Sequence, residues 1–359
     1  MQLKKIKLPF KAKKAILSVG SQTKNTVCFL RGEFAYLSGL HSDLSNPADF
    51  FSFEKDVKYF LRKHPKIIAH DLHSEYQSTK YALSLPTTYY LLPTQHHHSH
   101  IVSCMIDNGL KNQKVIGVAF DGTGLGTDNT LWGGEFFLCD YKNFQRVAHL
   151  KEIPLLGGER AILEPWRLAA AWTGKAKNKK IWQVLKKMQA ANFNSPLSSS
   201  MGRLFDAAAS LILKKDVAGF EAELAIELEK LAFSFQLPAV SYKFKIYQNN
   251  GMYILDPLPM FRKIITDLKA GKPNAEIAYR FHVTVAKMTE KACTLLKKKS
   301  RINQVVLSGG VFQNKLLLGL TAELLKNSGF SVSTHQALSC NDSGISLGQV
   351  VIAEELSTA

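Results

Sequence analysis

Long hydrophobic runs are missing from this 359-residue sequence. A helix that crosses a membrane needs about 20 consecutive apolar residues, and no stretch approaches that length. The basic N-terminal segment is followed by neither a long apolar run nor a small-residue cleavage site, so we expect no signal peptide. These absences predict a protein without a membrane partner.

Cysteine is scarce as well. The five cysteines are scattered, odd in number and include no C-x-x-C pair, which argues against a disulfide framework and a zinc ribbon and favours a cytoplasmic location. The phosphate-binding signatures G-x-x-x-x-G-K-[ST] and G-x-G-x-x-G are also absent, which disfavours P-loop and Rossmann folds. No internal repeat of fixed period is visible in the sequence.

Acidic residues are too few to balance the basic ones, and the net charge is +17 at pH 7. The excess is mostly lysine in short runs that contain no interleaved aromatic residues. Such a surface can attract nucleic acid, nucleotide or an acidic protein. A solvated, lysine-rich surface is the simpler interpretation, so nucleic acid is a disfavoured partner.

Apolar runs that end in glycine-containing turns lie near both ends of the chain, on either side of a helix-rich middle. Residues 15–32 predict a β-hairpin. Residues 115–121 and 305–310 predict strands buried on both faces. Because a single core rarely exceeds about 300 residues, we expect two lobes. The pattern predicts an open α/β enzyme with ligands at the carboxyl ends of its strands.

Four of the eleven histidines lie between positions 96 and 100, at the start of a predicted helix. His96 and His100 are one turn apart and share a helix face, so both can bind one metal ion. His97 and His98 point elsewhere and are candidates for contacts with the ligands or the substrate.

Two histidines do not complete a metal site, and carboxylates at strand ends are natural partners. Asp121 ends the strand of residues 115–121, and Asp342 opens the last predicted helix. Either aspartate could complete a site with two histidines and two aspartates. Mixed nitrogen and oxygen ligands suit iron(II), zinc or manganese.

Three turns are candidates for phosphate binding, because glycine lets backbone amides approach phosphate oxygens. They comprise residues 121–124 after a buried strand, residues 20–26 with Lys24 as a cation, and residues 308–310. Together they favour a nucleotide held between two lobes.

The sequence resembles the C-terminal carbamoyltransferase domain of the HypF family of hydrogenase maturation proteins. Matching segments occur in family order over nearly the whole chain: His70-Asp71-Leu72-His73, Gln95 to His100, Phe120 to Gly124, Trp132 to Glu135, Glu164 to Arg167, Ser200 to Asp206, Leu307 to Asn314 and Asn341 to Gln349. The TsaD-type tRNA threonylcarbamoyl-transferring enzymes are similar but usually lack the segments at 164–167 and 200–206.

The resemblance implies a two-lobed, actin-like ATPase fold, related to sugar kinases and hsp70, with a helical insertion around residues 150–300. It places residues 1–112 and the C-terminal helix 343–359 in the N-terminal lobe, and residues 113–342 in the second lobe.

The resemblance also implies site residues. The metal ligands would be His96, His100, Asp121 and Asp342, the first three also being catalytic. The nucleotide contacts would be Lys24, Gly122, Thr123, Gly124, Asp206, Gly309, Gly310 and Asn314, with Asp206 at the ribose. The expected cofactors are a divalent metal, with iron or zinc favoured over a nucleotide-bound magnesium, and ATP or carbamoyl-adenylate.

The implied reaction transfers a carbamoyl group from carbamoyl-adenylate to the C-terminal cysteine of a HypE-type protein. The family's acylphosphatase, zinc-finger and YrdC-like segments have no counterpart in this sequence, so a separate YrdC-like or acylphosphatase protein is expected to supply the donor. Where the family commonly has Glu-Gly-Gln-Ala, this sequence has Glu221-Ala222-Glu223-Leu224, which is expected to alter the nucleotide pocket. The alternatives are a TsaD-like tRNA enzyme, a small-molecule O-carbamoyltransferase and a regulatory subunit without turnover.

Overall fold

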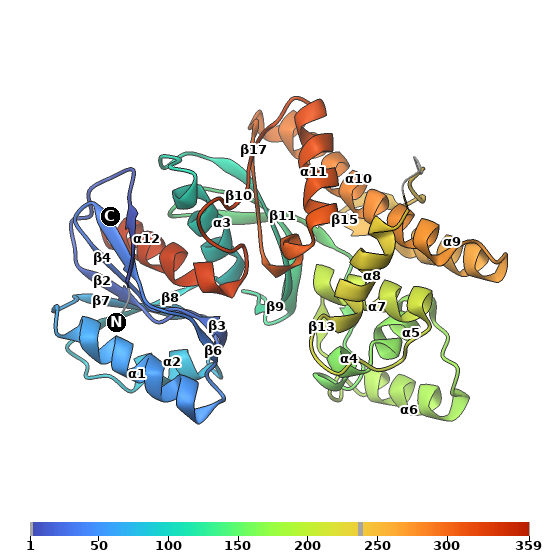
Figure 1. Cartoon of the computed structure of the whole chain (residues 1–359), viewed down its shortest axis with the longest axis horizontal. Helices are drawn as coiled ribbons and strands as arrows, with labels where there is room; N and C mark the ends of the chain where they lie inside the picture. Colours follow the sequence, from blue (N-terminus) through green and yellow to red (C-terminus); the bar gives the residue numbers. More distant parts are fainter. Residues whose placement is uncertain (1–2, 236–239, 359) are drawn as a thin grey trace.

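Two mixed β-sheets, with helices between and around them, form the molecule (Figure 1). The computed structural model describes residues 3–235 and 240–358. Residues 1, 2 and 359, at the ends of the predicted N-terminal lobe, lie outside the described residues. The first sheet lies at one end of the molecule, and the helices of residues 160–233 lie at the other (Figure 1).

The first sheet has the strand order β1-β5-β4-β2-β7-β8. Its strands are β1 (Lys4–Lys7), β2 (Ile16–Ser18), β4 (Cys28–Arg31), β5 (Phe34–Leu37), β7 (Ile67–Asp71) and β8 (Tyr90–Thr94). The pairs from β1 to β2 are antiparallel, whereas β7 and β8 run parallel to β2. The predicted hairpin is therefore present as β2–β4. The short strand β3 (Thr23–Asn25) interrupts its connection and pairs with β6 (His41–Asp43).

Helices α1 (Pro47–Leu61) and α2 (Gln77–Leu83) lie on one face of the first sheet, where apolar side chains of both helices meet those of the strands. Helix α1 begins at the N-cap Asn46, whose side chain accepts a hydrogen bond from the Ala48 N–H, and Pro47 occupies the first helical position. A proline there costs no hydrogen bond, because that N–H has no partner in the helix.

The second sheet has the strand order β14-β15-β11-β10-β9-β16-β17, with the two-residue strands β12 and β13 beside it. Its strands are β9 (Val115–Leu125), β10 (Leu131–Cys139), β11 (Phe144–Leu150), β12 (Ile153–Pro154), β13 (Leu197–Ser198), β14 (Lys245–Asn249), β15 (Met252–Asp256), β16 (Gln304–Ser308) and β17 (Ser331–Ser333).

The two sheets share one topology. In each, three consecutive strands form an antiparallel meander, and two later strands lie parallel to the first strand on its other side. The orders are β5-β4-β2-β7-β8 and β11-β10-β9-β16-β17. This duplication, which no repeat in the sequence reveals, confirms the predicted two-lobed α/β fold.

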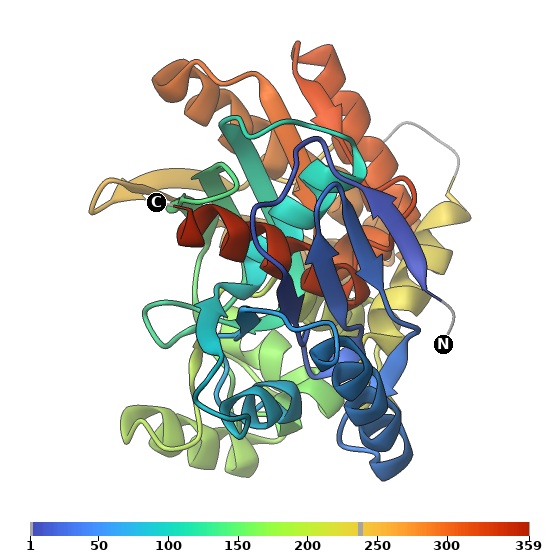
Figure 2. The same ribbon diagram turned by 90° about the vertical axis from the view of Figure 1, so that its left-hand side faces the viewer.

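Helix α3 (His96–Asp107) follows β8 and helix α12 (Ile345–Ser357) comes after β17, the last strand of each repeat, and the two helices pack against each other between the sheets (Figure 1 and Figure 2). They approach so closely that a Cβ atom at Gly348 would overlap the carbonyl oxygen of Ser99. Helix α12 also contacts β2, β4 and β7 of the first sheet. The division of the chain into lobes near residue 112 stays a prediction.

The middle of the chain is only partly the helical insertion that was predicted. It contains helices α4 (Arg160–Leu163), α5 (Trp166–Thr173), α6 (Lys179–Ala190), α7 (Met201–Leu213), α8 (Glu223–Phe233), α9 (Leu258–Lys269) and α10 (Asn274–Ser300). It also contains the β14–β15 hairpin, which extends the second sheet because β15 pairs with β11. Within the described ranges, no helix is both long and apolar enough to cross a membrane.

The predicted turn at residues 121–124 is wrong, because β9 continues through these residues to Leu125. Trp132 pairs with Gly124 and Gly134 pairs with Phe120, so residues 121–123 are opposed by Gly133 alone. This is a bulge, which re-aims side chains and leaves backbone groups without ladder partners. Gly133 has a φ of +152°, and a Cβ atom there would lie 2.6 Å from the Asp121 carbonyl oxygen.

Candidate functional site

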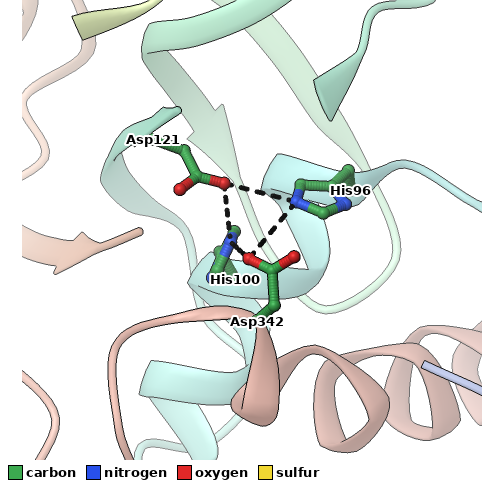
Figure 3. A group of neighbouring side chains, drawn as sticks. All are labelled: His96, His100, Asp121 and Asp342. Carbon is green, nitrogen blue, oxygen red and sulfur yellow. Dashed lines mark hydrogen bonds and ion pairs between the residues drawn. The ribbon is translucent and has the colours of Figure 1, made fainter. Parts of the chain in front are cut away.

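The structure brings the four predicted metal ligands together (Figure 3). One ligand atom from each of His96, His100, Asp121 and Asp342 lies within 4.8 Å of the others. The Nε2 atoms of both histidines lie 3.3 Å from Oδ2 of Asp121, and 3.9 and 3.6 Å from Oδ1 of Asp342. No other such group occurs in the part of the chain that the structure describes.

Three separate elements supply these side chains. The histidines occupy the first and second turns of α3, Asp121 lies in the bulge of β9, and Asp342 opens the 3-10 helix η2 (Asp342–Gly344) before α12. Both histidines are buried, whereas the Asp342 side chain is 18% exposed, so the cluster opens to solvent on the side of Asp342. Two nitrogen and two carboxylate ligands with one open side fit a divalent transition metal.

Asp71 is a residue of the site that sequence reasoning did not assign. Its Oδ2 atom lies 2.7 Å from Nδ1 of His96, and both side chains are fully buried. Its Oδ1 atom accepts a hydrogen bond from the His73 N–H. A carboxylate on Nδ1 keeps the proton there, which leaves Nε2 free to bind a metal. Asp71 ends the buried strand β7 just as Asp121 ends the apolar run of β9, and that pattern could have revealed it.

The pKa values of His96, His100 and Asp121 are shifted from their usual values. Burial alone would lower the pKa of His96, but the neighbouring Asp71 and the hydrogen bond to Asp121 raise it well above its usual value. Burial would also lower the pKa of His100, but its hydrogen bonds to Asp121 and Asp342 raise it. Burial would raise the pKa of Asp121, yet the two histidines hold it well below its usual range. Without a metal, the site therefore retains protons on its histidines.

The two remaining histidines of the cluster have different environments. Nε2 of His98 lies 2.7 Å from the Asp140 carbonyl oxygen, and burial lowers its pKa to about 4, so it is a neutral structural residue. Nδ1 of His97 lies 3.2 Å from the Gln95 amide nitrogen. Its Nε2 is buried without a hydrogen-bond partner among the described residues, and its ring lies against Gly124.

The bulge of β9 meets the N-terminus of α7. The Ser200 hydroxyl lies 2.8 and 2.6 Å from the carbonyl oxygens of Asp121 and Gly122, and it accepts a hydrogen bond from the Arg203 N–H as the N-cap. A Cβ atom at Gly202 would lie 2.9 Å from the Gly122 Cα atom. The N-terminus of α7 therefore packs on Gly122, and the positive end of its dipole lies beside the bulge, which suits an anionic ligand nearby.

A charged group lies beside this junction, in which Arg203 and Asp206 are buried and Glu221 is exposed. Arg203 is almost fully buried and contacts Asp206 at 3.3 Å and Glu221 at 2.8 Å. Burial raises the pKa of Asp206 to about 6, against the opposing effect of Arg203. Asp206 was predicted as a nucleotide contact. Arg203 and Glu221 occurred only within the motif at 200–206 and the altered segment at 221–224, and neither was given a role of its own.

The other predicted nucleotide residues are more dispersed. Gly310 adjoins the cluster, since its N–H donates to Oδ1 of Asp121 at 3.0 Å. The Asn314 side chain caps α11 (Lys315–Asn327) and lies 3.0 Å from Nε2 of His282. Thr123 and Lys24 are exposed, the latter on β3. Their contacts with a nucleotide remain predictions.

The two β-sheets repeat one topology, and the helices between them complete an α/β fold of two related halves. Residues 117–349 match the family model for the second subdomain of the carbamoyltransferase Kae1-like domain, and residues 11–107 match that of the HypF Kae1-like domain. The chain belongs to the HypF carbamoyltransferase family.

Two curated relatives differ in length. The chain is 33% identical to carbamoyltransferase HypF2 of Cupriavidus necator, over 94% of this chain and 46% of that protein. It is 32% identical to a carbamoyltransferase HypF homolog of the same organism, over 96% of this chain and 92% of that protein. The chain thus spans about half the length of HypF2 but nearly all of the shorter homolog.

Two solved structures share the fold over 99% of this chain. Full-length HypF in a phosphate- and nucleotide-bound form superposes with a TM-score of 0.94 and 38% identity, and the match covers 57% of that chain. HypF of T. kodakarensis superposes with a TM-score of 0.86 and 25% identity, and the match covers 49% of that chain.

Proposed function

We propose that this protein transfers a carbamoyl group from carbamoyl-adenylate to the C-terminal cysteine of a HypE-type protein during nickel–iron hydrogenase maturation. The observation that carries the proposal is the convergence of His96, His100, Asp121 and Asp342, with Asp71 behind His96, beside a glycine-containing bulge. Family membership supports carbamoyl transfer as the reaction.

The four ligands would hold iron(II) or zinc. Such a metal, when bound, supplies a positive charge that polarises a carbonyl and neutralises phosphate. The bulge and the N-terminus of α7 would accept the phosphate of the adenylate, and Asp206 would lie at the ribose. Arg203 would offset the charge of the departing nucleotide, because it is buried beside Gly122.

The reaction balances without a further reactant. The acceptor thiolate forms a bond to the carbamoyl carbon, and the bond between that carbon and the phosphate oxygen breaks. AMP leaves with the electron pair. Because the acceptor supplies a thiolate, the site needs no general base of its own.

The donor and the compartment follow from the same proposal. A separate YrdC-like or acylphosphatase protein would supply the donor: water would release phosphate from carbamoyl phosphate to give carbamate, and carbamate would then displace pyrophosphate from magnesium-bound ATP to give carbamoyl-adenylate. The described cysteines are free thiols and four of the five are buried, which suits a reducing compartment, and we propose the cytoplasm.

Mass spectrometry of an acceptor peptide tests the proposal. A HypE-type C-terminal peptide is incubated with this protein, a YrdC-like protein, carbamoyl phosphate and ATP. We expect carbamoylated cysteine with the parent protein and with Glu323→Gln, a variant of an exposed carboxylate on α11. We expect none with Asp121→Ala. No modified peptide under any combination would refute the proposal, and a changed tRNA nucleoside profile on gene deletion would favour the TsaD-like alternative.

A further inference from the structure

A histidine outside positions 96–100 lies near the four candidate metal ligands but is not one of them. His335 lies between β17 and η2, and its side chain is 4% exposed. Its Nε2 atom lies 2.9 Å from the Ser308 hydroxyl oxygen, and its Nδ1 atom contacts Oδ2 of Asp107 at 3.3 Å. We name these three residues the His335 bridge.

The order serine, histidine, aspartate is that of a hydrolase triad. However, Ser308 is fully buried, so its hydroxyl is closed to a substrate. The contact between His335 and Asp107 is also an ion-pair contact rather than an aligned hydrogen bond. The bridge is therefore suited to connecting chain segments and not to nucleophilic attack.

Each member of the His335 bridge lies on a segment that carries candidate ligands. Asp107 ends α3, the helix whose first two turns supply both histidine ligands. Ser308 ends β16, which pairs with β9, the strand of Asp121. His335 lies on the segment that leads to Asp342. The bridge thus joins all three elements of the cluster.

Asp107 fixes the segment that leads to η2. Its carboxylate accepts hydrogen bonds from the N–H groups of Gln336, Ala337 and Leu338, at 2.7, 3.1 and 3.1 Å. Burial would raise its pKa, but His335 and these N–H groups hold it at about 2. Asp107 therefore stays ionised and keeps these contacts.

Ser308 connects the His335 bridge to Asp121, one of the four candidate metal ligands. The next residue, Gly309, has a φ of +106°, and its N–H donates to the Cys340 carbonyl oxygen at 3.0 Å. The N–H of Gly310 then donates to Oδ1 of Asp121. Because few residues intervene, the position of Ser308 determines where this last N–H points.

We propose that the His335 bridge positions the four candidate ligands, so that metal affinity depends on His335 although His335 does not bind the metal. This inference rests on the proposed function, since it takes the cluster to be a metal site. The bridge positions the two histidine ligands through Asp107, which ends α3, and it positions Asp121 through the Gly310 N–H.

The test measures the dissociation constants for Zn²⁺ and, anaerobically, Fe²⁺ by competition with a chelating dye. We expect His335→Ala and Ser308→Ala to weaken binding by about tenfold to a hundredfold, as for other residues that orient ligands. His335→Gln should recover part of the loss, because its amide can reach Ser308. The double variant should lose less affinity than the product of the two single losses, because both substitutions remove the contact between His335 and Ser308.

His149→Ala is the control, because His149 is also buried but lies on β11 and bonds to the Leu150 carbonyl oxygen. It should lower the melting temperature without changing metal affinity. Metal affinities of both bridge variants within twofold of the parent would overturn the inference. If His335→Ala does not fold, Ser308→Ala decides the outcome alone. A parent protein that binds no metal would instead refute the proposed metal site.

Discussion

Asp71 determines which nitrogen of His96 carries the proton and which is free to bind a metal. Replacing it by asparagine keeps the shape of the side chain but lets its amide donate to Nδ1, which moves the proton to Nε2. We expect Asp71→Asn to weaken metal binding by about tenfold to a hundredfold, measured by competition with a chelator. Asp216→Asn, a partly exposed aspartate that pairs with Lys177, should bind like the parent. Unchanged affinity in Asp71→Asn would contradict this role.

The raised pKa values of His96 and His100 make metal binding dependent on pH. A metal binds the neutral imidazole, so protons compete with it. Affinity should therefore fall as the pH drops below these raised values and reach its maximum above them. Calorimetry in buffers of different ionisation enthalpy should detect proton release on binding. Affinity that is constant over the pH range in which histidine titrates would contradict the account.

Single residues of the site were predictable to different degrees. His96 and His100 follow from helical spacing, whereas Asp121 and Asp342 were left open until the family resemblance was applied. Arg203 and Glu221 could not be found by spacing, because their contact joins two segments that no local pattern connects. Lys24 was named from the turn at residues 20–26 and again by the resemblance, whereas Asn314 was named by the resemblance alone, and both stay predictions as nucleotide contacts.

At the scale of elements, the start of α8 carries a strained residue. Ala222 precedes the helix with a φ of +65°, a conformation that costs most residues about 1–2 kcal/mol but glycine little. The family resemblance led us to expect glycine where this chain has Ala222. We expect Ala222→Gly to stabilise the protein by about 0.5–1 kcal/mol in denaturant unfolding. Ala225→Gly, inside the same helix, should destabilise it by about 1 kcal/mol. A loss of stability in Ala222→Gly would refute the strain.

The crossing of α3 and α12 is the contact that sets the ligand-bearing elements against each other. Because a Cβ atom at Gly348 would overlap the Ser99 carbonyl oxygen, Gly348→Ala should force the helices apart. We expect a loss of about 3 kcal/mol in unfolding free energy. Gly319→Ala on α11 has open space around it and should instead gain about 1 kcal/mol. Equal effects of the two substitutions would contradict the close crossing.

Elements were predicted well where the periodicity was strong. The buried strands β9 and β16 and the start of α3 at His96 follow from their sequence patterns. The β14–β15 hairpin was missed, although Asn250-Gly251 is a common hairpin turn, because neither strand alternates apolar and polar residues and β14 is largely exposed. The sequence predicted a turn at residues 121–124 where the structure has the bulge of β9, because glycines after an apolar run are common in turns and in bulges.

For the whole molecule, the repeated topology of the two sheets explains why the cluster lies where it does. Helices α3 and α12 are corresponding elements of the two repeats: α3 carries both histidine ligands, and η2, which carries Asp342, leads directly into α12. Sequence periodicity could not reveal this duplication, because the two repeats share strand order rather than side chains.

The most direct test supplies carbamoyl-adenylate itself, so that the source of the donor no longer matters. Metal-free protein, metal-loaded protein and Asp121→Ala are each mixed with labelled carbamoyl-adenylate and a HypE-type acceptor, and label on the acceptor cysteine is measured. We predict transfer and AMP release by the metal-loaded parent alone. Transfer at the same rate by Asp121→Ala or by the metal-free protein, or no transfer by any form, would contradict the account.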